Sequence, residues 1–87
     1  MSLSFPNPSR SYDSQSSRIR FVGHDGMFQI SFSITVDALS ERNSGPLDGE
    51  ADFLRAFDAG HEFIQEIARK AYAKTRKSSY AFTAADI

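Results

Sequence analysis

The sequence contains no cysteine, no long apolar run and no excess of charge of either sign. Without cysteine the chain can form no disulfide framework and no thiolate zinc site, and it offers no thiol nucleophile. No apolar stretch approaches the roughly 20 residues of a membrane-spanning helix, and the first residues lack the basic and apolar regions of a signal peptide. We therefore expect a cytoplasmic protein that does not bind membranes.

The balance of charges also limits the classes of partner. The formal net charge is −1, so nothing attracts the whole chain to nucleic acid, and any such binding would need a local basic patch. Hydrophobic residues make up 40% of the 87 residues, which is ordinary for a folded protein. We expect one domain over residues 1–87, with a small core that homodimerisation would help to stabilise.

The clearest local pattern is a predicted β-hairpin from Arg18 to Val36, in which two alternating segments flank Asp25-Gly26. If His24 faces Met27 across this turn, the apolar residues of both segments share one face of the sheet. That predicted inner face consists of Ile19, Phe21, Phe28, Ile30, Phe32, Ile34 and Val36. Met27 and Val22 are apolar exceptions on the outer face.

Helices are predicted after the hairpin. Asp37 is a candidate N-cap for a short helix over ALSER, and the segment from Glu50 to about Lys77 keeps a helical period that only Gly60 weakens. Tyr80 to Thr83 alternates again and predicts a final strand, while Ser2 to Phe5 is a candidate edge strand. We predict a small α+β fold: an antiparallel sheet covered on one face by a long helix and a short helix.

The stretch FPNPSRSYD, Phe5 to Asp13, has neither a helical nor a strand period. Its two aromatics could dock on apolar surface, and Arg10 and Asp13 have a spacing that permits pairing. We interpret it as a structural strap rather than a binding loop. Whether the strap covers Phe63 and Ile67 is left open by the sequence.

The long helix carries a second apolar row beside its main stripe. This row is formed by Ala56, Gly60, Phe63 and Ile67, about 70 to 110° around the helix from the residues that face the sheet. Either the strap or the short helix covers this row, or it packs against a second copy of the chain in a homodimer.

Chemical motifs are absent. The chain has two histidines and no metal-binding spacing, no phosphate-binding loop and no nucleophile elbow, so we expect no metal, no cofactor and no catalytic residues. His61 is interpreted as a core or rim histidine. One enzyme hypothesis places Arg10, Tyr12 and Asp13 at a pocket edge, because loops often carry sites.

Basic residues give an alternative function. Nucleic-acid contacts are predicted at Arg18, Arg20, Arg69, Lys70, Lys74, Arg76 and Lys77. Against this, a basic last turn is what a helix dipole favours, and the outer sheet face carries no aromatic residue that could stack on a base.

Four segments together resemble a known family: FPNPSRSYD, RIRFVGHDGMFQISFSI, FLRAFDAGHEFIQEIARKAY and SYAFTAADI. They are similar to a bacterial domain-of-unknown-function family, number fourteen eighty-eight. The resemblance implies a compact α+β fold and transfers no activity. We expect a non-enzymatic protein-interaction or regulatory module that self-associates through the long helix, the alternative being a nucleic-acid-binding regulator.

Overall fold

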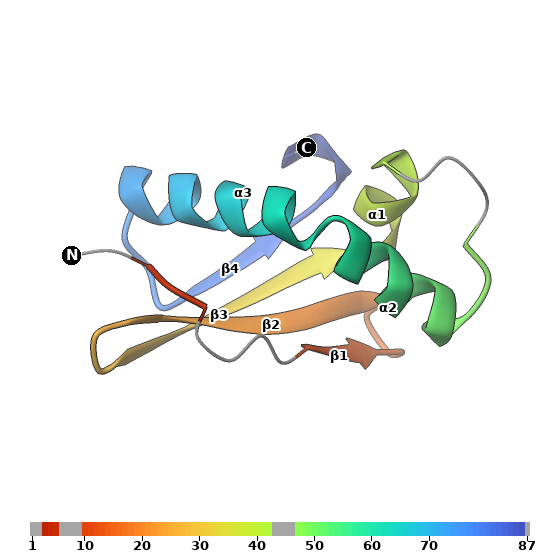
Figure 1. Ribbon diagram of the computed structural model, residues 1–87, viewed down its shortest axis with the longest axis horizontal. Coiled ribbons are helices and arrows are strands. Elements are labelled where there is room, and N and C mark those ends of the chain that lie inside the picture. The colour runs from red at the N-terminus through yellow and green to blue at the C-terminus, as the bar shows by residue number, and fades with distance from the viewer. Residues whose placement is uncertain (1–2, 6–9, 43–46, 87) are drawn as a thin grey trace.

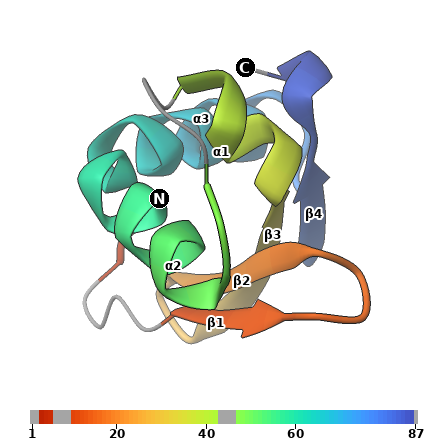
Figure 2. The ribbon, with the colours of Figure 1, turned by 90° about the vertical axis from the view of Figure 1, so that its right-hand side faces the viewer.

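The computed structural model describes residues 3–5, 10–42 and 47–86, which form a four-stranded sheet with helices on one face (Figure 1). The strands are β1 (Arg10–Asp13), β2 (Arg18–Asp25), β3 (Phe28–Thr35) and β4 (Ser79–Phe82), and they lie in that order across the sheet. Figure 2 shows the helices of the described residues together on one face of the sheet. The predicted α+β fold is confirmed.

The sheet is mixed, not antiparallel as predicted. β1, β2 and β3 pair antiparallel, whereas β4 pairs parallel to β3 with Ser31 opposite Ser79. The chain crosses from the end of β3 over the sheet through the helices, and this long crossover returns β4 in the same direction as β3.

The hairpin forms as predicted, but its turn is displaced. Asp25 faces Phe28, so Gly26 and Met27 form the turn instead of Asp25 and Gly26. Gly26 adopts the positive φ of 63° that the tight turn requires. The shift in pairing is two residues, and because side chains alternate with a period of two, the apolar face is preserved.

Within the described residues, three α-helices follow the hairpin: α1 (Val36–Arg42), α2 (Glu50–Ala59) and α3 (His61–Lys74). The predicted long helix is therefore two helices that meet at Gly60, whose φ of −106° and ψ of 15° depart from helical values. The predicted cap of the short helix is also corrected: α1 begins before Asp37, and the Thr35 hydroxyl accepts a hydrogen bond from the Ala38 amide at 3.2 Å.

The core lies between the sheet and the helices. Ile19 on β2, Ile34 on β3 and Ile64 on α3 are at most 2% exposed, and they belong to one buried cluster. Around them are buried Leu3, Phe21, Ile30, Phe32, Ala38, Leu39, Phe57, Ala68, Tyr72 and Phe82. Two residues of the predicted inner face differ from the rest, because Phe28 is exposed and Val36 is half-buried at the start of α1.

The N-terminal segment runs beside β2. Ser4 exchanges two backbone hydrogen bonds with His24, each 2.8 Å long, so the predicted edge strand is an isolated bridge in its described part. The edge strand is instead β1, which is the second half of the predicted strap; Ser2 and Pro6 to Ser9 lie outside the described residues. A 3₁₀ turn, η1 (Ala84–Asp86), follows β4.

Candidate functional sites: a cleft beside strand β2 and the hairpin tip

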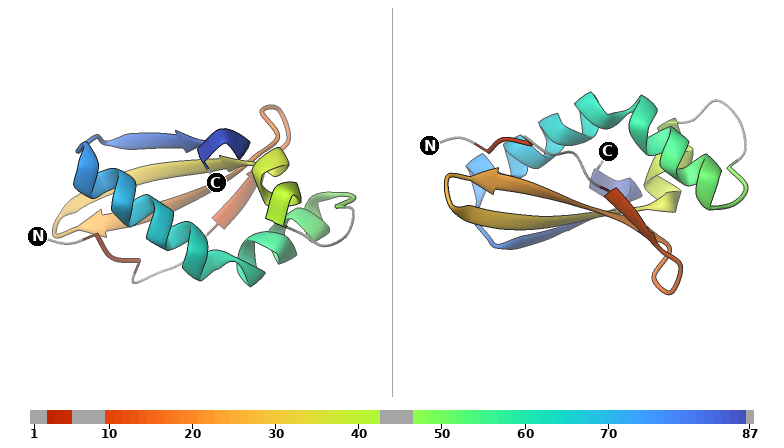
Figure 3. Two further views of the ribbon diagram at one scale, coloured as in Figure 1. Left: turned by 90° about the horizontal axis from the view of Figure 1, so that it is seen from above. Right: turned by 60° about the horizontal axis from the view of Figure 1, so that its bottom comes forward.

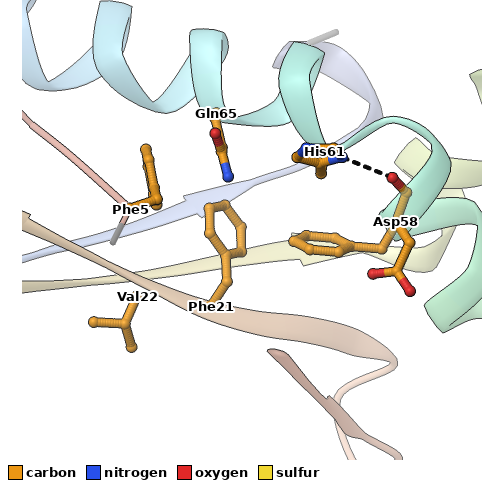
Figure 4. A pocket seen from close by; sticks show the side chains of 7 residues that line it. Phe5, Phe21, Val22, Asp58, His61 and Gln65 are labelled. Carbon is orange, nitrogen blue, oxygen red and sulfur yellow. Dashed lines mark hydrogen bonds between the residues drawn. The ribbon is translucent and has the colours of Figure 1, made fainter. Parts of the chain in front are cut away.

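The first candidate site is a cleft of about 280 Å³ between β2 and the junction of α2 with α3, which we name the β2–α3 cleft. It is lined by Phe5, Phe21, Val22, Phe57, Asp58, His61 and Gln65. Figure 4 shows Gln65 extending from α3 toward Phe21 on the strand below. The change of direction at Gly60 brings Asp58 from α2 and His61 from α3 to the same rim.

Aromatic rings form the apolar part of this cleft. The Phe21 ring lies 5.2 Å from the Phe57 ring and 6.2 Å from the Phe5 ring, measured between centroids. Phe21 and Phe57 belong to the core, whereas Phe5 is half-buried and packs against it. The cleft therefore has an aromatic lining held by the fold itself.

The rim of the cleft is polar and ordered by hydrogen bonds. Arg10 binds Asp58 through two contacts, Nε to Oδ1 at 2.8 Å and Nη2 to Oδ2 at 2.7 Å. These hydrogen bonds, with the charges of Arg10 and His61, hold the pKa of Asp58 below its ordinary value, although burial opposes the shift. The same hydrogen bonds raise the pKa of Arg10. His61 Nδ1 lies 2.8 Å from the Asp58 backbone oxygen.

The second candidate site is the tip of the hairpin. Met27 is 100% exposed and its neighbour Phe28 is 67% exposed. Phe28 lines a groove of about 380 Å³ together with Tyr72, Arg76 and Lys77, among other residues. We name Met27, Phe28, Arg76 and Lys77 the hairpin-tip surface.

A buried hydrogen bond ties this tip to α3. Asp25 is 4% exposed, and its Oδ2 accepts a hydrogen bond of 2.6 Å from the Tyr72 hydroxyl. This hydrogen bond, together with burial and the charge of Asp25, raises the pKa of Tyr72 above 10.0. The Arg76 guanidinium lies 5.6 Å from the centre of the Tyr72 ring, which keeps that cation near the tip. The bond also explains why Asp25 stays in the strand and does not form the turn.

The predicted dimer row is partly covered by the protein's own fold. Ala56, Gly60, Phe63 and Ile67 are all half-buried, and Ala56 and Ile67 pack against the core. Of the described strap residues, Phe5 lies beside α3 with its ring centre 5.3 Å from the Arg69 guanidinium, about 120 to 160° around the helix from Phe63 and Ile67. The prediction that the strap covers this row also concerns Pro6 to Ser9, which lie outside the described residues. Figure 3 shows the N-terminal segment on one side of α3 and β4 on the other. Association of two copies through this row stays a prediction.

The predicted nucleic-acid contacts fall into two separate groups. Arg18 and Arg20 lie on the uncovered sheet face, where Arg20 pairs with Asp13 at 2.8 Å and Arg18 donates to Ser33 at 3.3 Å. The other five lie on or just beyond α3, across the opposite face: Arg69, Lys70, Lys74, Arg76 and Lys77. The sheet separates the two groups, so they do not form one patch. Nucleic-acid binding stays a prediction.

The residues of the enzyme hypothesis do not converge. Arg10 binds Asp58, the Tyr12 ring packs 5.2 Å from the Phe53 ring, and Asp13 pairs with Arg20 on the uncovered face. The spacing of Arg10 and Asp13 permits pairing, but these two residues pair elsewhere, because alternation along β1 places their side chains on opposite faces.

The sequence interpretation missed most of both sites. It placed His61 at the core or rim but gave no role to Asp58 or Gln65, which nothing in the local pattern distinguishes from ordinary helix-surface residues. For the hairpin tip a signal was present: Met27 interrupts the polar outer pattern next to the turn.

Two classes of site find no support in the described ranges. Among residues 3–5, 10–42 and 47–86, no three histidine or acidic side chains gather closely enough to hold a metal ion. In the same part of the chain, the helices lack the length and apolar content needed to cross a bilayer.

Comparison with known proteins places the chain in a family without an assigned activity. No curated protein and no solved structure matches it. A family model described as a protein of unknown function, DUF1488, matches residues 3–83. This match spans most of the 87 residues and includes the strap, the hairpin and both long helices. The chain belongs to the DUF1488 family.

Proposed function

We propose that this protein is a non-enzymatic interaction module that binds a protein partner through its hairpin-tip surface. The observation that carries the proposal is the pair of neighbouring apolar side chains at the tip, Met27 at 100% exposure and Phe28 at 67%. Exposed apolar area costs about 25 cal/mol per Å² relative to buried area, and a partner would recover it.

The residue types at the tip are those of interfaces. Methionine, phenylalanine and arginine are enriched in protein interfaces, where aromatic residues often act as anchors. Phe28 stands at the edge of a groove, so a partner side chain could enter beside it. The hydrogen bond between Asp25 and Tyr72 holds this arrangement before binding, which lowers the entropy lost on association.

Charge suggests the chemistry of the partner. Arg76 and Lys77 line the groove beside Phe28, and both residues are exposed. A partner surface that combines apolar contact with acidic side chains would complement this pattern and gain in specificity and association rate. We therefore expect an acidic protein partner.

Site-directed cross-linking tests the proposal. Because the chain has no cysteine, Met27→Cys provides a single attachment point for a photoreactive label at the tip. Ala81→Cys provides a matched control at an exposed position of β4. We expect a discrete protein to be cross-linked from position 27 and not from position 81, and the purified pair to reproduce that cross-link. Equal capture from both positions, or failure of the purified pair to cross-link, would contradict the proposal.

A further inference from the structure

We propose that the β2–α3 cleft binds a small, neutral, planar aromatic or heteroaromatic molecule that carries an N–H or O–H donor. This site is separate from the hairpin-tip surface: the two share no lining residue among those described. The inference therefore does not depend on the proposed protein partner.

The shape of the cleft selects a planar ligand. Phe5, Phe21 and Phe57 line the cleft, and their rings pack on one another at centroid separations of 6.2 Å for Phe5 with Phe21 and 5.2 Å for Phe21 with Phe57, so they form one continuous aromatic wall. A flat ring can contact these rings, whereas a branched aliphatic group of similar volume leaves gaps. Ligand sites usually combine such an apolar lining with a few placed polar groups.

The volume sets the size of the ligand. A cavity of about 150 Å³ is enough to hold one benzene ring. The cleft has about 280 Å³, so it accommodates one ring with substituents or two fused rings. A larger ligand would extend into solvent beyond the rim.

The rim sets the charge of the ligand. Both Asp58 oxygens accept hydrogen bonds from Arg10, so the carboxylate and the guanidinium neutralise each other. A charged ligand would have to compete with this bidentate pair. A neutral ligand can leave it intact.

His61 determines whether the ligand donates or accepts a hydrogen bond at the rim. Its Nδ1 lies 2.8 Å from the Asp58 backbone oxygen, and a carbonyl oxygen can only accept, so Nδ1 carries the proton. In the neutral imidazole Nε2 is then an acceptor, which suits an N–H or O–H donor on the ligand. Gln65 also lines the cleft and extends from α3 toward Phe21 in Figure 4, and its amide group can donate or accept a hydrogen bond.

Two ring systems of one shape test the proposal directly. Indole carries an N–H donor, and benzofuran has an oxygen at the same place; each is titrated into the ¹⁵N-labelled full chain and followed by NMR. We expect indole to shift the signals of Phe21, Phe57, His61 and Gln65 and to bind at least fivefold more tightly than benzofuran. His61→Ala should remove most of that difference. Gln65→Ala should weaken indole binding, whereas Gln29→Ala, at an exposed position of β3, should not.

Several results would overturn the proposal. One is the absence of saturable shifts at these residues up to about 10 mM indole, the Kd that corresponds to about −0.3 kcal/mol for each of about nine non-hydrogen atoms. Equal affinity for benzofuran, or an unchanged preference in His61→Ala, would also reject it. Tighter binding of the tripeptide Gly-Trp-Gly than of indole would assign the cleft to a peptide side chain instead of a small molecule.

Discussion

The two ends of the β2–β3 hairpin carry similar apolar residues in opposite environments. At the base, Ile19 and Ile34 face each other and are 0% and 1% exposed. At the tip, Met27 and Phe28 are 100% and 67% exposed. Residue type therefore does not decide burial along this hairpin.

The difference follows from the lengths of the neighbouring elements. β4 begins opposite Ser31, so it does not pair with the first three residues of β3. On the inner face, the residue opposite Phe28 is Asp25, and α3 contacts it with the Tyr72 hydroxyl, not with an apolar side chain. The base is buried by the fold and the tip is not, which is why we assign the tip to a partner.

The largest expected effect is a difference in stability between a substitution in the core, above the base of the hairpin, and a substitution at the tip. Ile64→Ala removes a side chain that is 2% exposed, and we expect it to lower the free energy of unfolding by about 2–5 kcal/mol. Met27→Ala should change it by less than about 0.5 kcal/mol, since surface substitutions seldom do more. Urea unfolding of both variants measures the difference. Similar losses would show that the tip is part of the core.

The second prediction concerns the bond between the tip and α3. Tyr72→Phe leaves the buried Asp25 carboxylate without its hydroxyl donor, so we expect a lower unfolding midpoint than in Tyr12→Phe, which changes a half-buried tyrosine on β1. Equal midpoints in the two variants would argue against this bond as the support of the tip.

The same bond has a pH dependence. Because folding raises the pKa of Tyr72, the unfolded chain releases that proton first as pH rises above about 10, and stability falls with increasing pH. Tyr72→Phe should reduce this alkaline loss. Unfolding midpoints measured from pH 8 to 11 test it, and an unchanged slope in the variant would contradict it.

A third prediction tests the close approach of the N-terminal segment to β2. A Cβ at Gly23 would lie 2.9 Å from Leu3 and 3.0 Å from Phe5, so Gly23→Ala should destabilise the fold by about 1–3 kcal/mol. A Cβ at Gly60 would lie 3.6 Å from the Ala56 carbonyl oxygen, an ordinary contact distance, so Gly60→Ala should be neutral or slightly stabilising. Denaturant unfolding compares the two variants. A tolerated Gly23→Ala would mean that the segment packs elsewhere.

The smallest effect is expected on the uncovered sheet face. Hydrogen bonds from Arg20 and Ser16 lower the pKa of Asp13 to about 2, so the stability it contributes is present above pH 3.8 and is lost as pH falls toward 2. Arg20→Gln should raise the pKa of Asp13 toward its ordinary value. An NMR titration of the Asp13 carboxyl measures this shift, and an identical midpoint in both proteins would refute the pairing.

Much of the fold could be predicted because it depends on local periodicity. Alternation identified the faces of the hairpin, and the helical period from Glu50 onward identified the helices. Gly60 was recognised as the weak point of the predicted long helix, where α2 and α3 now meet. The direction of β4 could not be predicted, because it depends on the end of the sheet at which α3 stops and β4 begins.

The candidate sites were less predictable for the same reason. The cleft depends on contacts between residues distant in sequence, such as Arg10 with Asp58, which are 48 positions apart. The turn was displaced because a hydroxyl 47 positions away, on Tyr72, holds Asp25 in the strand. Exposure of Phe28 depends on where β4 begins. No local period contains this information.

The most direct test of the hairpin-tip proposal is the affinity of the purified cross-linked partner for Phe28→Ser. The control is Ser31→Ala, at an exposed position on the outer face of β3. We expect Phe28→Ser to fold normally and to bind at least tenfold more weakly than wild type, with Ser31→Ala unchanged, because anchor residues of this kind contribute at least about 1.4 kcal/mol. Equal affinity of Phe28→Ser and wild type would contradict the assignment of the hairpin tip as the binding surface.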